Sequence, residues 1–341
     1  MKILVDAFGG DNAPLEIIKG AIDALNSNKE FVIVFLGDEN ILTKELANFH
    51  YESNRVEIIH APSVISNDES PTEAFRKKRD SSIVKGLTLL NSDSQYNAFV
   101  SAGSSGAVLA SAVLLLKRIK GVTRPALVPI LPTLNDDSVV LIDCGANADC
   151  NAKNLLEFAY MGASYATTVL GVKNPRVGLL SNGSEDKKGN ALNRDVFPLL
   201  KSANLNFIGN AEAREILTGV YDVIVTDGFS GNIALKSSEG VAIMLLSLIK
   251  KNILVGGLRA KIGYLFLKPV FKKIAHVMDY NNKGGAILLG LQKVVIKAHG
   301  SSKAKSISAS IIQALTIAKS QLINNIADTI PKLKESSIDK D

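Results

Sequence analysis

Residues 2–14 read KILVDAFGGDNAP, and this stretch predicts the fold because it passes from a strand through a glycine turn into a helix. Residues 3–5 form a short apolar run of the kind that buried strands show. Pro14 suits the first turn of a helix, and apolar residues at three- and four-residue spacing follow it. Between strand and helix, Gly9 and Gly10 allow positive φ angles and leave backbone amides open to an anion.

The same alternation of strand and helix continues along the chain. Helical patterns cover residues 105–117, 154–170 and 231–249. Apolar runs of strand length begin at Phe31, Val56, Asn97, Ser138, Arg176, Leu205 and Tyr221. Strands that alternate with helices form crossover units, so the sequence predicts an α/β fold, an αβα sandwich with a mostly parallel sheet.

The domain organisation is read from composition and from the lack of linkers. With 341 residues and 46% hydrophobic residues, the chain has the composition of a globular protein. No Gly-, Ser- or Pro-rich linker divides it, so we expect one interleaved α/β catalytic domain over residues 1–330. Its last helix is expected at residues 307–326, and a charged tail at 331–341.

The sequence also bears on location. No run reaches 18 uncharged apolar residues, which predicts that no segment spans a membrane. Only three apolar residues precede Asp6 after a single lysine, which is too short for a signal peptide. We therefore expect a cytoplasmic protein.

The basic charge of the chain is regional. The net charge is +6, yet the segment from Lys250 to Met278 alone has seven basic residues and no acidic one. The rest of the chain therefore has a net charge of −1. This distribution predicts one cationic surface that could face anionic lipid, an acidic protein or nucleic acid.

Within residues 250–280, apolar side chains recur every three or four positions among the basic ones, which predicts an amphipathic helix. It could lie on anionic lipid, bind an acidic protein or pack against a second copy of the chain. No nucleic-acid-binding motif accompanies it, so nucleic acid is not expected as a partner. The candidate surface residues are Leu258, Arg259, Lys261, Ile262, Phe266, Lys268, Lys272 and Lys273.

Five predicted strands end in loops of one composition. Small, polar or acidic residues fill positions 101–106, 143–147, 181–185, 209–210 and 227–232. Ordinary turns use the same residue types. In open parallel sheets, however, ligands bind beyond the carboxyl ends of the strands, where these loops would converge. Five such loops together favour a binding site.

Several common sites have no motif in the chain. It contains no Gly-x-x-x-x-Gly-Lys-Ser/Thr loop, no Gly-x-Gly-x-x-Gly after a strand and no His-Glu-x-x-His. Neither Ser-Gly turn matches the Gly-x-Ser-x-Gly of a hydrolase nucleophile. The sequence therefore favours neither a nucleotide cofactor, nor zinc, nor a serine hydrolase.

The chain does contain the residues that hold an oxyanion such as phosphate. Glycine turns and serine hydroxyls at helix N-termini suit this task. Lys188 adds a cation in the segment 184–190, and His299, Ser301 and Ser302 precede the last helix. His299 could equally be a hydrogen-bonded structural residue, and either serine could simply cap the helix.

Seven stretches together resemble the PlsX family, the bacterial phosphate acyltransferases of phospholipid synthesis. They are residues 2–14, 101–110, 141–166, 176–190, 206–216, 223–240 and 294–307. They cover nearly the whole chain in order, and the Asp-Gly-Phe-Ser-Gly-Asn and His-Gly-Ser-Ser segments are the most specific.

This resemblance implies a fold and a reaction. The fold would be isocitrate-dehydrogenase-like or phosphotransacetylase-like, in a homodimer. The reaction would transfer a long-chain fatty acyl group from acyl carrier protein to inorganic phosphate. The acyl phosphate would then serve a membrane acyltransferase on the route to phosphatidic acid. Because no cofactor or metal motif is present, we expect neither a cofactor nor a metal.

Such a reaction suggests roles for the candidate residues. Phosphate is already an adequate nucleophile, so the protein mainly positions reactants and stabilises the thioester oxyanion. We expect Lys188 to offset phosphate charge, His299 or Ser302 to protonate the leaving thiolate, and Asp227 to accept from a protonated phosphate oxygen. The other acidic residues are expected to hold loops and lysines. The residues expected to bind phosphate or substrate are Asp6, Gly9, Gly10, Asp11, Asn12, Ser101, Gly103, Ser104, Gly106, Asp143, Asn147, Asn210, Gly228, Ser230, Asn232 and Ser301.

Two alternatives remain open at this point. A phosphotransacetylase acting on a coenzyme A thioester would use the same chemistry on a shared fold. A non-catalytic scaffold that docks carrier protein at a membrane would use only the cationic surface. Donor specificity distinguishes a phosphotransacetylase from an enzyme that uses acyl carrier protein. The convergent loops argue against a scaffold, because docking alone does not require them.

Overall fold

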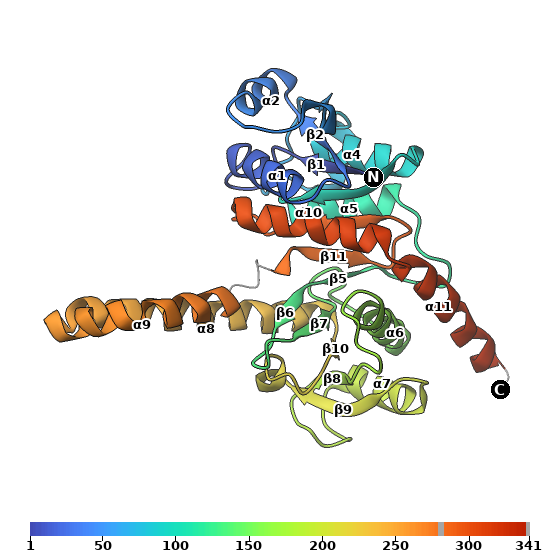
Figure 1. Ribbon diagram of the computed structural model, residues 1–341. Helices are drawn as coiled ribbons and strands as arrows, with labels where there is room; N and C mark the ends of the chain where they lie inside the picture. The colour runs from blue at the N-terminus through green and yellow to red at the C-terminus, as the bar shows by residue number, and fades with distance from the viewer. Residues whose placement is uncertain (279–282, 339–341) are drawn as a thin grey trace.

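The computed structural model describes residues 1–278 and 283–338, and it describes the side chains of these residues except in 275–278 and 331–338. Within these residues, the strands form two sheets, and helices pack against both of them (Figure 1). The first sheet has the order β3 (Val56–His60), β2 (Val32–Gly37), β1 (Lys2–Asp6), β4 (Tyr96–Ser101), β12 (Val294–Lys297), β11 (Ala286–Leu289) and β5 (Ala126–Val128). The second has the order β6 (Ile130–Pro132), β7 (Ser138–Ile142), β10 (Val223–Val225), β8 (Val177–Ser181) and β9 (Phe207–Glu212).

Most neighbouring strands are parallel. The exceptions among the described strands are β11, which is antiparallel to β5 and β12, and β6, which is antiparallel to β7. The α/β fold with a mostly parallel sheet is therefore confirmed. The first sheet takes strands from both ends of the chain, and the second takes its strands from the middle.

Helices cover both faces of the first sheet. α1 (Leu15–Ser27) and α10 (Ala304–Lys319) pack together on one face, while α4 (Ser82–Ser92) and α5 (Ser105–Leu115) pack on the other (Figure 1). Strand β1 shows why its sequence is apolar throughout. Ile3 and Val5 belong to the core under α1 and α10, while Leu4 belongs to the core under α4. Burial on both faces is typical of a parallel strand.

The other helices complete the layers. α2 (Glu39–Leu46) follows β2, and α3 (Pro71–Lys77) packs on α5. α6 (Ala152–Thr168) covers one face of the second sheet, and α7 (Ala191–Ser202) lies beside β8 and β9. Short 3₁₀ turns occur at η1 (Ser53–Arg55) and η2 (Ala213–Glu215). One buried cluster continues from β1 through α6 to β10, so the two sheets share a core.

The C-terminal helix differs from the prediction of one helix over residues 307–326. The chain instead forms α10 and a separate α11 (Leu322–Ile338). Ser320 causes the break because its backbone is extended and its hydroxyl accepts from the Leu322 amide. α11 also continues to Ile338, so the backbone is helical over residues 331–338, where a charged tail is expected.

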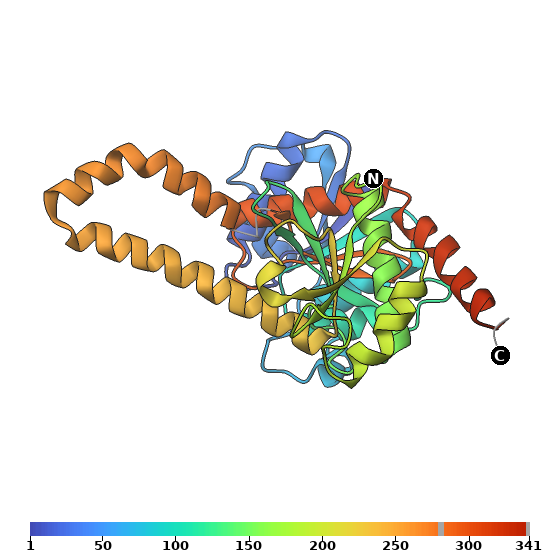
Figure 2. The same ribbon diagram turned by 90° about the horizontal axis from the view of Figure 1, so that it is seen from below.

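A helical arm projects from the body. It consists of α8 (Gly228–Val255) and α9 (Gly257–Met278), which join at a tight turn and run back alongside each other (Figures 1 and 2). By length and hydropathy, α8 could cross a membrane. Its first turns belong to the body, however, where it begins directly after β10. The expectation that no segment spans a membrane stays a prediction.

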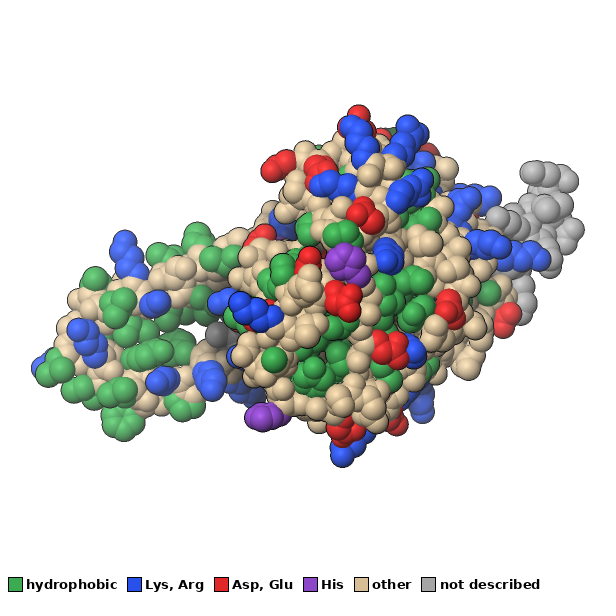
Figure 3. All heavy atoms as spheres, turned by 90° about the horizontal axis from the view of Figure 1, so that it is seen from above, with side chains coloured by type: hydrophobic (Ala, Val, Ile, Leu, Met, Phe, Trp, Pro, Cys, Tyr) green, Lys and Arg blue, Asp and Glu red, His purple; other side chains and the backbone are tan. Residues whose placement is uncertain are grey.

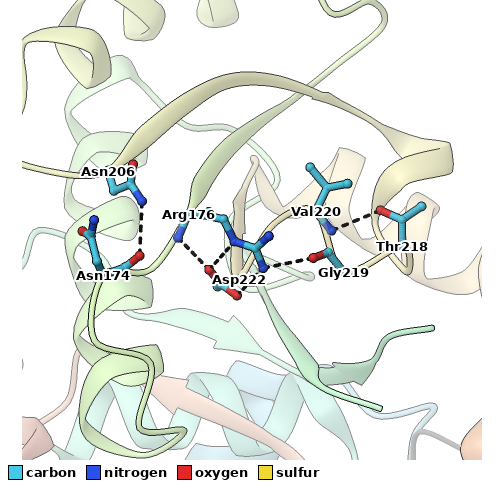
Figure 4. Close-up of polar contacts among 7 residues, drawn as sticks. All are labelled: Asn174, Arg176, Asn206, Thr218, Gly219, Val220 and Asp222. Carbon is cyan, nitrogen blue, oxygen red and sulfur yellow. Dashed lines mark hydrogen bonds and ion pairs between the residues drawn. The ribbon is translucent and has the colours of Figure 1, made fainter. Parts of the chain in front are cut away.

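The amino ends of the second sheet are held by an ion pair (Figure 4). The Arg176 guanidinium donates to both carboxylate oxygens of Asp222 at 2.9 Å, and the Arg176 amide donates at 2.7 Å. Arg176 also donates to the Gly219 carbonyl at 3.0 Å. Burial raises the pKa of Asp222, but the hydrogen bonds and charge of Arg176 outweigh burial and hold that pKa below its usual range.

Candidate active site

A polar cavity of about 310 Å³ opens between the two sheets, at the carboxyl ends of their strands. Five residues singled out from the sequence line it, and they come from segments distant along the chain: Asp11, Gly103, Asn232, His299 and Ser301. Asn232 lies in the second turn of α8 and the other four lie in loops. The convergence expected from the loop composition is therefore present for the loops after β1, β4, β10 and β12.

Behind the lining, a buried hydrogen-bond chain fixes the loop after β4. The Gly103 amide donates to Ser101 Oγ at 3.0 Å, and that hydroxyl donates to Asp6 Oδ2 at 2.6 Å. A Cβ on Gly9 would lie 2.3 Å from Asp6 Oδ2, so only glycine allows this approach. Burial raises the pKa of Asp6, against the hydrogen bond from Ser101. Asp6 thus holds the loop and does not line the cavity.

The loop after β1 is tied to the loop after β12. The Asp11 amide donates to the Gly300 carbonyl at 2.8 Å. The Asn12 side chain donates to the Ser301 and Ser302 carbonyls at 3.1 and 3.2 Å. Gly10 supplies the turn between them with a φ of +94°. Asn12 and Gly10 therefore shape the cavity wall from behind.

The N-terminus of α5 faces the cavity. Gly103 and Ser105 line it, while Ser104 Oγ accepts from the Ala107 amide as the helix cap. Gly106 lies one residue further on and lines a smaller space of about 90 Å³. A helix N-terminus presents free amides and a partial positive charge, which favours an anion here.

On the second sheet, Asp143 organises the facing loops. Its carboxylate accepts from the amides of Leu127, Ala146 and Asn147 and from the Asn147 side chain, at 2.7 to 3.1 Å. Burial raises the pKa of Asp143, against these hydrogen bonds. The Gly228 amide donates to the Asn147 carbonyl at 2.8 Å, and a Cβ at Gly228 would lie 2.6 Å from that oxygen. The position of the N-terminus of α8 is thus fixed by Asp143, Asn147 and Gly228.

A buried lysine in the cavity was missed by the sequence reasoning. Lys297 ends β12, is only 8% exposed and lines the cavity. Its ammonium donates to the carbonyls of Ala102 and Ala298, and no ion pair to it is present among the described residues. Burial lowers the pKa of Lys297 to about 8, against the charges of Asp6 and Asp11. The sequence feature that could have predicted it is a lysine at the end of an otherwise apolar strand.

His299 lies beside a second lysine that sequence reasoning missed. Its Nε2 is 3.4 Å from Lys236 Nζ, and its Nδ1 is 2.8 Å from Ser301 Oγ. Lys236 also forms an ion pair with Glu239 at 2.8 Å, and all of these residues line the cavity. Burial and the charge of Lys236 lower the pKa of His299. The imidazole is therefore neutral near pH 7.

Other predicted residues lie outside this lining. Lys188 is exposed on the loop between β8 and α7, and the Asn210 side chain donates to the Glu185 carbonyl at 2.7 Å. Asp227 caps α8 by accepting from the Ser230 amide, and Ser230 lines a different hollow. Ser302 is buried, with its hydroxyl 3.1 Å from Ser306 Oγ.

The described residues of the cavity wall also bear on thiol and metal chemistry. Cys144 lines it, but burial raises its pKa well above the usual range, so the thiol stays protonated and is a poor nucleophile. Among the described residues, no group of three His, Cys, Asp or Glu side chains is arranged to hold a metal ion.

The predicted surface residues lie on the arm. Leu258 and Phe266 are 74% and 81% exposed, and Ile262 is also exposed. The basic residues Arg259, Lys261, Lys268, Lys272 and Lys273 are exposed on the same helix. Figure 3 shows hydrophobic and basic side chains intermingled along the arm.

The fold is similar to that of a solved enzyme. A phosphotransacetylase from Streptococcus pyogenes superposes with a TM-score of 0.62 at 18% identity, over 93% of this chain and 94% of that one. This likeness defines the fold class as an α/β protein with the fold of the phosphotransacetylases.

The relatives by sequence narrow this class to one family. Residues 1–325 match the family described as "Fatty acid synthesis protein". A phosphate acyltransferase from Clostridium tetani is 44% identical over 98% of this chain and 99% of its own. Another, from Thermoanaerobacter pseudethanolicus, is 46% identical over 98% of each chain. The chain belongs to the PlsX family of phosphate acyltransferases, as its sequence motifs predict.

Proposed function

We propose that this phosphate acyltransferase moves a long-chain fatty acyl group from acyl carrier protein to inorganic phosphate and releases an acyl phosphate. The observation that carries the proposal is the buried Lys297 ammonium in the same cavity as the N-terminus of α5 and His299. A cation, free amides and a neutral base together suit a phosphate nucleophile and a thioester.

Phosphate binds in this proposal between Lys297 and the start of α5. The Lys297 ammonium is charged below its pKa of about 8. Its present partners are two carbonyl oxygens, so a phosphate oxygen is a stronger acceptor for it. The amides near Gly103 and Ser105 supply the remaining donors.

The chemical step needs no covalent enzyme intermediate. An oxygen of hydrogenphosphate attacks the thioester carbon, the carbon–sulfur bond breaks, and the thiolate leaves with the bonding electrons. The proton lost by the attacking oxygen ends on the thiolate, so the step is balanced. His299, neutral near pH 7, relays this proton, and Lys236 beside it stabilises the developing negative charge.

The other catalytic candidates take supporting roles in this proposal. Asp227 caps α8, the helix that places Asn232 in the cavity wall. Ser302 holds the start of α10 through Ser306. Lys188, on its exposed loop, stays a sequence prediction for phosphate binding, to be tested against Lys297.

The proposed partners follow from the arm and from the family. Exposed apolar and basic residues on α9 suit an interface with anionic lipid, close to the membrane acyltransferase that would use an acyl phosphate. The same surface could instead receive the acidic carrier protein or the partner of a homodimer. We propose a cytoplasmic protein whose arm contacts the membrane surface.

The test of the proposed function is release of free thiol from palmitoyl-carrier protein. The full-length protein is incubated with this donor, with and without orthophosphate and without added metal or nucleotide. The proposal predicts thiol release that requires phosphate, and an acyl phosphate that hydroxylamine traps as a hydroxamate.

The alternatives give different results. Release that is equal without phosphate would indicate a thioesterase, and no release would favour a scaffold. Faster reaction with acetyl-coenzyme A than with palmitoyl-carrier protein would make the protein a phosphotransacetylase. Any of these results would overturn the proposal.

A further inference from the structure

A second cavity, of about 410 Å³, lies at the base of the arm. Its walls come from β6 and the loop after it, from the segment after η2, from α8 and from the returning end of α9. The side chains that face it are mainly aliphatic, among them Leu131, Leu134, Leu217, Leu235, Ala242 and Ile274. This cavity therefore suits an apolar ligand.

The apolar cavity adjoins the polar one. Leu235 and Glu239, on one face of α8, line both of them. The Glu239 charge is met by Lys236 at 2.8 Å, so the boundary between the cavities is an ion pair and not an isolated charge. From Leu235 the apolar wall continues along α8 to Ala242, a distance of about 10 Å.

The apolar cavity is also partly open. Leu134 is 82% exposed, and Ile274 is 42% exposed. Large aliphatic side chains left in water next to a hollow indicate a surface that a ligand covers. A flexible chain could enter here and reach the reaction centre without crossing the packed core.

We infer that this cavity binds the hydrocarbon chain of the acyl donor, with its thioester at the boundary near Leu235 and Glu239. The inference rests on the proposed function, and it deepens it by assigning the acyl-chain subsite and its length selection to α8. The occupant is a hydrocarbon chain because the apolar cavity shares Leu235 and Glu239 with the cavity where its carbonyl would react.

Ala242 is the position that tests this assignment. It lies two turns from Leu235 and lines the far part of the cavity, so Ala242→Phe would shorten the cavity and leave the reaction centre open. Each methylene displaced into water lowers kcat/KM by about fourfold. A phenyl ring that displaces three methylenes therefore lowers kcat/KM for palmitoyl-carrier protein by about 60-fold.

The matched control is Ile243→Phe. Ile243 is the next residue on α8, is 67% exposed and lines neither cavity. The full-length wild type and both variants are assayed with hexanoyl- and palmitoyl-carrier protein. The inference predicts that kcat/KM falls only for Ala242→Phe with the palmitoyl donor. For hexanoyl transfer, kcat/KM of this variant changes by less than about threefold.

Binding of palmitate, measured by calorimetry on the same proteins, provides a readout that does not depend on acyl transfer. The inference predicts that palmitate binds the wild type and Ile243→Phe alike and binds Ala242→Phe at least tenfold more weakly. If the wild type transfers no acyl group but palmitate shows this pattern, the proposed function fails and the chain site stands.

Three results would overturn the inference. One is an equal loss of hexanoyl and palmitoyl transfer in Ala242→Phe. Another is unchanged transfer and unchanged palmitate binding. The third is a change in sedimentation for Ala242→Phe alone, which would show that a second copy of the chain covers this cavity.

Discussion

The carboxylates at the two ends of the second sheet differ in their partners and in the direction of their pKa shifts. At the amino ends, Asp222 receives three hydrogen bonds from Arg176, and its pKa is held below the usual range (Figure 4). At the carboxyl ends, Asp143 has no cation bound to it among the described residues and its pKa is raised by burial. Lys297, which ends β12 of the first sheet and lines the cavity between the two sheets, has its pKa lowered to about 8.

This contrast separates a structural end from a functional one. The Arg176–Asp222 pair is complete, so it needs no ligand and serves to hold β8 beside β10. The Lys297 ammonium has two carbonyl oxygens as partners instead of the anion that a buried cation requires. Buried ionisable groups that have a shifted pKa and no partner of opposite charge are typical of sites that bind charged substrates.

The largest expected effect is on catalysis at the carboxyl ends. Lys297→Ala removes the cation that we assign to phosphate, and we expect kcat/KM to fall by about 10²–10³ with the same fold retained. Steady-state kinetics and a thermal melt on the same preparation measure both quantities. Lys188→Ala, on an exposed loop, is expected to lower kcat/KM by less than about threefold, the size of effect typical of exposed charges.

The two lysine variants decide between the sequence prediction and the structure. If kcat/KM falls as much in Lys188→Ala as in Lys297→Ala, Lys188 acts at the reaction centre, and its loop must move to reach it. Unchanged activity in Lys297→Ala would remove the distinction between the cavity at the carboxyl ends of the strands and the structural ion pair at the amino ends of the second sheet.

The smallest expected effect is on stability at the amino ends. Arg176→Ala should lower the free energy of unfolding by about 1–2 kcal/mol at pH 7, because a charged hydrogen-bond donor is lost from a partly exposed pair. Activity should stay within twofold of the wild type, as roughly expected for a site away from the reaction. Denaturant titration measures the stability difference.

The pH dependence of that difference has a defined sign. The folded pKa of Asp222 is lowered, so the stabilisation is present above the ordinary Asp pKa of about 3.9 and is lost as pH falls through the folded value. Wild type and Arg176→Ala should therefore converge in stability at acid pH. A difference that persists there would mean that packing of the arginine stem, and not its charge, stabilises the sheet.

The sequence predicts the strand–helix alternation and the polar strand ends well, because both depend on local composition. Asp11, Gly103 and His299 line one cavity as expected, because parallel strands bring their carboxyl ends to one edge. The resemblance to PlsX added the reaction, which local patterns could not supply.

The residues that were missed depend on tertiary contacts. Lys297 ends an apolar run, and it is buried only because β12 pairs with β4 and aligns it with Ser101. Lys236 lies within a helix, where a lysine reads as solvated, and the packing of α8 at the cavity brings it to His299. Lys188 was favoured because it adjoins a glycine turn, yet its loop lies outside the cavity lining.

The most direct test of the central claim is the pH dependence of kcat/KM for phosphate in wild type and Lys297→Arg. This quantity reports groups of the free enzyme, and arginine stays charged throughout the range. The account predicts that kcat/KM of the wild type falls above a pH of about 8, as Lys297 loses its proton, and that Lys297→Arg lacks this fall. A fall that is the same in both proteins, or absent from the wild type, would contradict the assignment of Lys297 to phosphate.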